Sequence, residues 1–230
     1  MTRSRMTCLR ARGMEAEVGV DLKATEAARK RYDRIAPLYD MMEGFAEVLN
    51  NGKWRRLQWS KVEGTDILEV GVGTGKNFPW YPAGAEVTAI DFSRRMLERA
   101  RARSDKDKVK VRLMQMDVQN LEFGDNSFHT VVASFVFCSV PDPVRGLQEI
   151  RRVCRPGGKV ILLEHVLSTN RVLARLMNLF NPLAVRMMGA NINRRTVDNV
   201  VGSGLTIEKV TDLGGGIFKL IEAKKTATPS

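Results

Sequence analysis

The feature that most constrains the fold is a glycine loop directly after a short apolar run. Residues 66–70 read Asp-Ile-Leu-Glu-Val, and the chain continues as Gly71-Val-Gly73-Thr-Gly75. An apolar run that ends in closely spaced glycines indicates a strand followed by a tight turn, where the backbone can approach a ligand. In open α/β sheets, ligands bind beyond the carboxyl ends of the strands. The loop therefore predicts an α/β sheet with a cofactor site at that edge.

The spacing of this loop and the acid before it indicate the kind of cofactor. Dinucleotide-binding loops read G-x-G-x-x-G, with a helix N-terminus directed at a pyrophosphate. Here Gly75 comes one residue earlier, and Glu69 precedes the turn. A carboxylate there would repel a pyrophosphate but attract an ammonium group. The loop thus favours a cofactor with a cationic amino-acid end over a dinucleotide.

Two more acids follow the next two predicted strands. Asp91 ends the run at 86–90, and Asp117 follows the run at 109–114. Asp91 is placed to accept hydrogen bonds from a ribose diol, because a carboxylate is only an acceptor. Asp117, with the Val118 N–H beside it, could read an adenine edge. A single such acid is more often a helix cap, but acids and glycines at successive strand ends indicate a nucleoside site.

Short apolar runs alternate with amphipathic segments through the rest of the chain. We expect helices at 93–103, 142–153 and 194–202, and a hairpin turn at Gly214-Gly-Gly216. The expected strands are 66–70, 86–90, 109–114, 128–135, 159–164, 206–211 and 217–223. This alternation predicts an α/β, Rossmann-like, mainly parallel sheet with helices on both faces and N-terminal helices before it.

We divide the chain into three parts. Residues 1–14 would be a flexible N-terminal lead, and translation could begin at Met14. Residues 15–63 would form an N-terminal helical lid and membrane-facing segment. Residues 64–230 would form the cofactor-binding domain, with an apolar insert at 170–190.

Charge and composition limit the compartment and the partners. The formal net charge of +11 suits nucleic acid, an anionic membrane face or simply a solvated basic surface. Three cysteines without CxxC spacing indicate free thiols in a reducing compartment, and two histidines are too few for a zinc cluster. No apolar run reaches the ~18 residues of a membrane span. We therefore expect a cytoplasmic protein without a bound metal.

The motifs together resemble class I S-adenosylmethionine-dependent methyltransferases. The resemblance covers about residues 25–224 and rests on residues 69–75, Ile90-Asp-Phe-Ser93, Met116-Asp117 and Leu147-Gln-Glu-Ile-Arg-Arg-Val-Cys-Arg-Pro-Gly-Gly158. It implies a seven-stranded sheet with an antiparallel last strand and S-adenosylmethionine as the cofactor.

The resemblance also implies a role for each residue of the cofactor site. The methionine end would lie against the glycines, with Glu69 near its amine. Asp91 would hold the ribose, Phe92 and Met96 would flank the adenine, and Asp117 and Val118 would read the adenine edge. Ser134 and Phe135 would line the floor where the methyl group is transferred. The implied cofactor-binding residues are Tyr39, Glu69, Gly71, Gly73, Gly75, Asp91, Phe92, Met96, Asp117, Val118, Ser134 and Phe135.

Two further segments narrow the resemblance. Arg31-Tyr-Asp-Arg-Ile-Ala-Pro-Leu-Tyr-Asp40 is similar to the N-terminal element of quinone and phospholipid methyltransferases. Tyr32 and Tyr39 would close over the cofactor like a lid. Asn181-Pro-Leu and Gly189-Ala-Asn-Ile-Asn-Arg194 are similar to bacterial phosphatidylethanolamine N-methyltransferases.

The residues after the fourth strand argue against methylation of amino groups on DNA or RNA bases, and they leave carbon and oxygen methylation of RNA open. Enzymes that methylate an amino group of a base usually carry an Asp- or Asn-Pro-Pro-aromatic motif there, which holds a flipped-out base. This chain has Ala133-Ser-Phe-Val-Phe-Cys138 instead.

Two segments suit an anionic membrane surface and a phospholipid substrate. Leu173, Leu176, Met177 and Phe180 share one predicted helical face, while Arg171 and Arg175 share another. Lys53, Trp54, Arg55, Arg56, Trp59 and Lys61 form a second, basic-aromatic patch. The alternative is that both segments pack on the core.

The candidate catalytic residues are Tyr32, Tyr39 and His165. An amine acceptor must lose a proton, and a histidine with a pKa near ~6.5 at a strand end could accept it, or could merely end the strand. The tyrosines would orient the amine by hydrogen bonding or cation–π contact. His129 lies at the start of its strand and is treated as structural.

The sequence leaves three candidate functions for this chain. The first is methylation of phosphatidylethanolamine towards phosphatidylcholine by a monomer peripherally associated with the inner face of the membrane. The second is C-methylation of a ubiquinone or menaquinone precursor. The third is a non-catalytic nucleic-acid- or lipid-binding module on the same fold.

Overall fold

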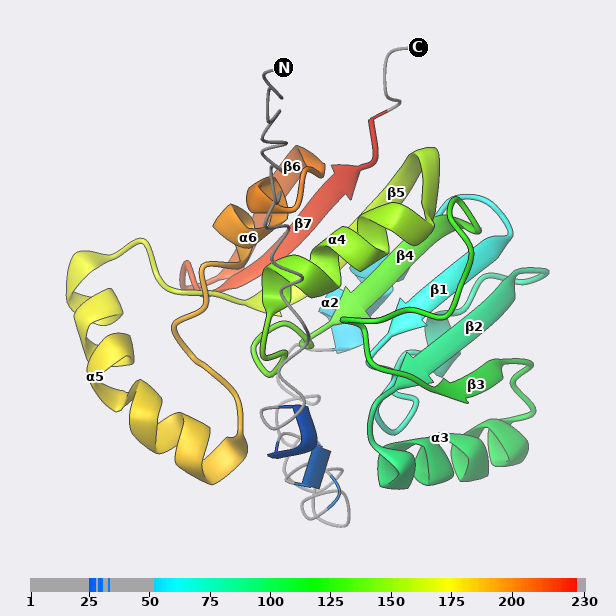
Figure 1. Ribbon diagram of the computed structural model, residues 1–230, viewed down its shortest axis with the longest axis horizontal. Coiled ribbons are helices and arrows are strands. Elements are labelled where there is room, and N and C mark those ends of the chain that lie inside the picture. The colour runs from blue at the N-terminus through cyan, green and yellow to red at the C-terminus, as the bar shows by residue number, and fades with distance from the viewer. Residues whose placement is uncertain (1–24, 28, 31–32, 34–51, 227–230) are drawn as a thin grey trace, which may run out of the picture.

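The computed structural model describes residues 25–27, 29–30, 33 and 52–226 of the chain. Tyr32, Tyr39, the predicted lead at 1–14 and most of the predicted lid lie outside the described residues. In the described part, seven strands form one sheet in the order β3-β2-β1-β4-β5-β7-β6 (Figure 1). The strands are β1 (Asp66–Val70), β2 (Glu86–Asp91), β3 (Arg112–Gln115), β4 (Phe128–Ser134), β5 (Cys154–His165), β6 (Thr206–Gly214) and β7 (Phe218–Lys224). β1 to β5 are parallel and β7 is antiparallel to both neighbours, which confirms the predicted fold class.

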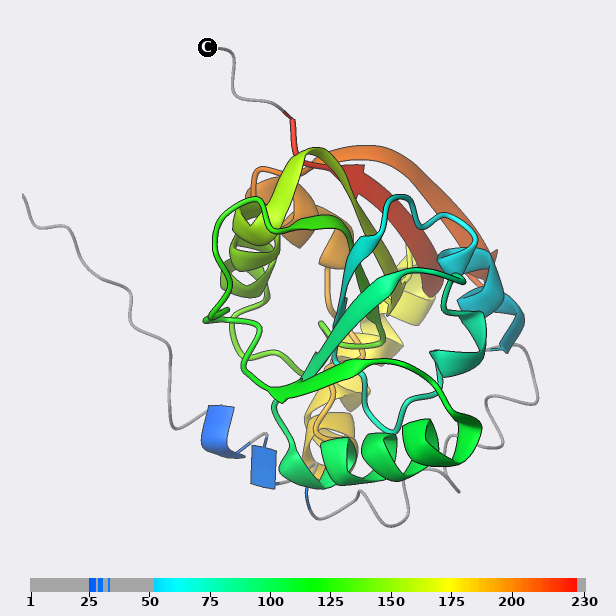
Figure 2. The same ribbon diagram turned by 90° about the vertical axis from the view of Figure 1, so that its right-hand side faces the viewer.

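Helices cover both faces of the sheet because its strands alternate side chains between the faces. The helices are α2 (Gly52–Trp59), α3 (Arg94–Asp107), α4 (Pro143–Val153), α5 (Arg171–Met188) and α6 (Thr196–Gly202), with a short 3-10 helix η2 (Phe78–Trp80). On one face, Leu68 and Val131 pack in a cluster with side chains of α4 and α6. On the other, Val132 packs with Trp59 of α2. Figures 1 and 2 show the resulting three layers.

The strand starts that differ most from prediction are those of β5 and β3. β5 begins at Cys154, which pairs with Phe128, so Pro156-Gly157-Gly158 lies inside the strand rather than before it. The Gly157 N–H donates to the Lys225 carbonyl at 2.8 Å. β3 begins later than predicted, at Arg112, because the helix before it extends to a left-handed Lys108 with φ of 54°.

The predicted membrane role of the basic-aromatic patch is wrong for two of its residues. Trp59 and Arg55 are 3% and 5% exposed, because α2 packs against the sheet. Gln58, fully buried between them, donates to the carbonyls of Ala133 at 2.8 Å and Ile161 at 3.0 Å. α2 is therefore part of the core.

Candidate cofactor site

The glycine loop between β1 and η2 adopts left-handed backbone angles. Gly71, Gly73 and Gly75 have φ of 68°, 54° and 81°. A Cβ on Gly71 would lie 2.4 Å from a methyl of Val136, whereas a Cβ on Gly73 would meet nothing within 4 Å. Gly71 is thus required by close packing, and Gly73 leaves open space for a ligand.

Asp91 ties the end of β2 to this loop. One carboxylate oxygen accepts from the Gly73 N–H at 2.9 Å, and the other accepts from the Ser93 N–H at 2.9 Å. The side chain is 6% exposed, and burial raises its pKa to about 6 against the opposing effect of these amides. Asp91 is therefore a buried acceptor beside the open space at Gly73.

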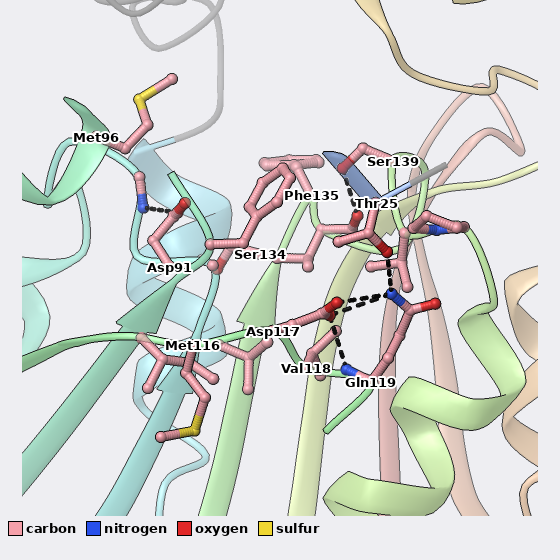
Figure 3. Close-up of a pocket in the computed structure, with 18 residues that line it drawn as sticks. Thr25, Asp91, Met96, Met116, Asp117, Val118, Gln119, Ser134, Phe135 and Ser139 are labelled. Carbon is pink, nitrogen blue, oxygen red and sulfur yellow. Dashed lines mark hydrogen bonds between the residues drawn. The ribbon is translucent and has the colours of Figure 1, made fainter. Parts of the chain in front are cut away.

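A pocket lies at the carboxyl ends of β1, β2 and β4 (Figure 3), and its empty space, with the adjoining open solvent, is about 670 Å³. Most of the predicted cofactor residues line it: Gly71, Gly73, Asp91, Phe92, Met96, Asp117, Val118, Ser134 and Phe135. Residues that sequence reasoning did not select line it as well: Thr25, Val70, Ile90, Met116, Gln119, Val136, Ser139, Val140 and Pro141.

Gln119 connects several parts of this pocket. Its backbone N–H donates to the Asp117 carboxylate at 2.9 Å, and its side-chain amide donates to the same carboxylate at 3.0 Å and to the Thr25 hydroxyl at 3.1 Å. Its side-chain oxygen accepts from the Asp142 N–H at 2.9 Å. The sequence shows a polar residue, Gln119, two positions after Asp117. It does not show that Gln119 is buried, with only 1% of its surface exposed.

The described part of the N-terminal segment reaches this pocket. Thr25 contributes to its lining, and the Asp33 carboxylate accepts from the Ser93 hydroxyl at 2.6 Å. The Arg95 guanidinium donates to the Asp33 carbonyl at 3.0 Å. Thr25 thus lies near Asp117, the predicted adenine contact, and Asp33 lies near the end of β2, where Asp91 is the predicted ribose contact.

Glu69 lies behind the pocket rather than in its lining. It is 1% exposed, and its carboxylate accepts from the Asn77 amide at 2.6 Å and from the Tyr81 hydroxyl. The same Asn77 amide donates to the Ser134 hydroxyl at 3.1 Å, so Glu69 supports the pocket floor. Burial raises the pKa of Glu69 to about 7. Direct contact with a cofactor amine stays a prediction.

Two other predicted residues also lie outside the lining. A Cβ on Gly75 would lie 2.3 Å from the Phe78 ring, so this glycine serves packing inside the loop. His165 ends β5 as predicted, and its ring packs on Phe218 with centroids 5.3 Å apart. Burial lowers the pKa of His165, which keeps the imidazole neutral near pH ~7. Its role as a base remains a prediction.

Glu164 supports the pocket floor and was missed by the sequence analysis. Its carboxylate accepts from the backbone N–H groups of Val136 at 2.9 Å and Phe137 at 3.1 Å. The residue before them, Phe135, has a left-handed φ of 59°. Such a backbone angle persists only where its surroundings hold it, and Glu164 is one group that does so.

Replacing Glu164 by Gln is expected to change the pH dependence of stability. Burial raises the pKa of Glu164 to about 8 from a usual value of 4.5. Between these values the unfolded chain has lost the proton that the folded chain keeps, so stability falls as pH rises. Gln has no proton to lose, and this part of the slope should vanish. Urea unfolding of both proteins from pH ~5 to ~9 measures the difference, and parallel curves would contradict the assignment.

The pocket fits an adenosine-bearing ligand. Asp91 and Asp117 offer acceptors for hydroxyl and amine donors, and Ile90, Met96 and Val140 offer apolar walls. The open space at Gly73 permits close backbone approach.

Comparison with known proteins agrees with this geometry. The family model described as a methyltransferase domain matches residues 68–162. A phosphatidylethanolamine N-methyltransferase of Cereibacter sphaeroides is 40% identical over 142 residues, which are 61% of this chain and 68% of that relative. A demethylmenaquinone methyltransferase of Renibacterium salmoninarum is 33% identical over 65% of this chain and 62% of its own length.

Solved structures show the same fold. The crystal structure of a SAM-dependent methyltransferase from Methanosarcina mazei matches with a TM-score of 0.61 and 23% identity, over 74% of this chain and 96% of that one. One family accounts for the glycine loop and for the acids at successive strand ends. The same family includes the Cereibacter sphaeroides relative, of which this chain covers 68%. This chain belongs to the S-adenosylmethionine-dependent methyltransferases, with S-adenosylmethionine as its cofactor.

Proposed function

We propose that this enzyme methylates the amine of phosphatidylethanolamine, towards phosphatidylcholine, at a membrane surface. The observation that carries the proposal is the 40% identity to a phosphatidylethanolamine N-methyltransferase, against 33% to the menaquinone relative. The chain also exposes large apolar side chains on α5. This helix follows β5 beyond the carboxyl edge of the sheet (Figure 1). A substrate held in a bilayer suits an enzyme with such a surface.

The residues of the pocket can bind and orient both reactants. When bound, S-adenosylmethionine supplies a methyl group on a sulfonium, which a nucleophile takes while the sulfur leaves as a neutral thioether. Asp91 would hold the ribose, and Asp117 with Val118 would hold the adenine edge. The Phe135 ring lines the pocket, and the Arg55 guanidinium already lies 5.4 Å from its centroid. An ammonium group of the substrate would bind the other face of this ring. The position of Phe135 depends on Glu164, which accepts hydrogen bonds from the backbone N–H groups of the next two residues, Val136 and Phe137.

The amine must lose one proton for its lone pair to form the new N–C bond. His165 is the described candidate base in this proposal, because its lowered pKa leaves a ring nitrogen able to accept that proton. Its ring contacts Phe218, which in turn packs edge-on against Phe135 with centroids 6.4 Å apart. Tyr32 and Tyr39 stay proposed as residues that orient the amine.

Product analysis tests this function directly. The purified protein is incubated with methyl-labelled S-adenosylmethionine and vesicles that contain phosphatidylethanolamine, and the lipids are identified by mass spectrometry. We expect labelled mono-, di- or trimethylated phosphatidylethanolamine. Unlabelled lipid together with a labelled quinone would overturn the proposal.

C-methylation of a quinone precursor is the second candidate. It is favoured by the identity to the demethylmenaquinone methyltransferase and by the same exposed apolar helix, because such precursors also reside in lipid. A demethylated quinol offered in the same vesicles distinguishes the two. The non-catalytic module considered from the sequence lacks support, since the family is one of enzymes.

A further inference from the structure

Helix α5 exposes one long apolar side. Val172, Leu176, Leu179, Phe180, Leu183 and Met187 follow one another at i, i+4, i+7, i+8, i+11 and i+15, which places them on one side of a helix. Their exposed fractions are 68%, 46%, 70%, 53%, 54% and 68%. We call these six residues the outer face of α5. Isolated exposed apolar residues are ordinary, but a continuous row of this kind marks an interaction site.

A different side of α5 faces the protein. Met177 and Ala184 are 7% and 8% exposed. Asn181 of the same helix accepts from the Ile192 N–H at 2.9 Å and donates to the Asn191 side chain at 3.2 Å. α5 thus packs against the rest of the protein through its inner side. Packing on the core does not explain why the outer face is apolar.

The inner side is connected to the wall of the cofactor pocket. Asn191 donates to the Cys138 carbonyl through its backbone at 2.8 Å and its side chain at 3.1 Å. Arg194 donates to the Val140 carbonyl at 2.8 Å, and Ser139 and Val140 line the pocket. Figure 1 shows α5 standing apart from the sheet beyond the carboxyl end of β5. Whatever binds the outer face is therefore held beside the pocket.

The charges on α5 identify the partner. Arg171, Arg175 and Arg186 are exposed along one border of the outer face, and the helix contains no acidic residue. Two copies of this face placed against each other would bring like charges together with no acid to pair them. An anionic lipid surface supplies both an apolar layer and phosphates for arginine. No helix in residues 52–226 is long and apolar enough to cross a bilayer.

We propose that the outer face of α5 lies in the interface of an anionic phospholipid bilayer, with the three arginines at the headgroups. The inference deepens the proposed function, on which it rests for the identity of the substrate, because it states how the pocket is brought to a lipid. Burying only one side suits a helix that lies in the interface plane.

Vesicle sedimentation with the full chain tests this proposal. The vesicles contain phosphatidylcholine alone or with phosphatidylglycerol, and no phosphatidylethanolamine, so that binding is independent of turnover. The outer-face variant carries Leu179→Gln, Leu183→Gln and Met187→Gln, since glutamine keeps helix propensity. A second variant carries Arg171→Gln, Arg175→Gln and Arg186→Gln. The charge-matched control carries Lys106→Gln, Lys110→Gln and Lys209→Gln, three exposed lysines away from α5.

We expect the wild-type chain and the lysine control to bind phosphatidylglycerol vesicles. The outer-face variant should lose binding by about tenfold or more. The arginine variant should lose the preference for the anionic lipid, and added salt should weaken wild-type binding. The affinity for S-adenosylhomocysteine should be unchanged in the outer-face variant, which shows that the domain is folded.

Several results would overturn the proposal. Wild-type protein that ignores anionic vesicles, or an outer-face variant that binds them as wild type does, contradicts it. A wild-type dimer in sedimentation velocity that the variant converts to monomer would assign the face to a second copy. A large loss of melting temperature in the variant would assign it to another part of this chain. Anionic vesicle binding without methylated phosphatidylethanolamine would leave the docking surface intact and refute the proposed function alone.

Discussion

Replacing Asp91 by Ala is expected to weaken S-adenosylhomocysteine binding by about 100-fold or more. Hydrogen bonds to a charged group contribute ~1.5–3 kcal/mol each, and a ribose diol would make two of them, while each 1.4 kcal/mol is a factor of ten. The loop would also loosen, because the Gly73 and Ser93 amides lose their acceptor. Isothermal titration calorimetry measures the loss, and Asp105→Ala, at an exposed position of α3, is the matched control.

The same residue sets an expected pH dependence of affinity. Hydroxyl donors need the ionised carboxylate, and the pKa of Asp91 in the free protein is about 6. Affinity should be level above this pH and fall about tenfold per unit below it. Asp91→Asn should remove this dependence while binding more weakly throughout. An Asp91→Ala variant that binds within about threefold of wild type would refute the site assignment.

Replacing Gly71 by Ala is expected to lower the free energy of unfolding by about 2–4 kcal/mol, which combines a left-handed backbone angle with overpacking. The angle is 68°, and the new Cβ would lie 2.4 Å from Val136. Adding Val136→Ala should recover part of the stability by relieving the contact but not the angle. Urea unfolding measures all three proteins.

Gly73→Ala is the matched comparison within the same loop. Its φ of 54° carries the backbone cost, but its Cβ would meet no atom within 4 Å. Its stability should fall by only about 1 kcal/mol, whereas its affinity for S-adenosylhomocysteine should fall strongly because the methyl group enters the pocket. Equal losses of stability in the two variants would contradict this division between packing and ligand approach.

The positions of the cofactor loop and of the acids were predictable because they depend on local patterns. A glycine run after β1, and acids after β2 and β3, need only the fact that parallel strands end at the same edge. Asp91 and Asp117 accordingly line one pocket. The class of cofactor followed from the same short stretches.

The supporting residues were not predictable, because their partners are remote in sequence. The amide of Gln119 donates to Thr25 across 94 residues, and Glu164 accepts from Val136 across 28. The partners of Glu69 were not predictable either, because its carboxylate accepts from Asn77 and Tyr81, which lie in the loop beyond the glycines. Burial and partner choice are decided by packing, which no local pattern records.

α5 shows most clearly which features follow from the sequence and which depend on tertiary structure. The sequence by itself predicted an apolar segment at 170–190 with one helical face from Leu173 to Phe180 and two arginines on another, because that follows from periodicity. It placed Leu176, Met177 and Phe180 on one face, yet Met177 is buried while Leu176 and Phe180 are exposed. A helix with two apolar sides has no local signal for which side meets the core. Only the tertiary structure decided that, through the Asn181 and Asn191 contacts that turn the inner side towards the pocket wall.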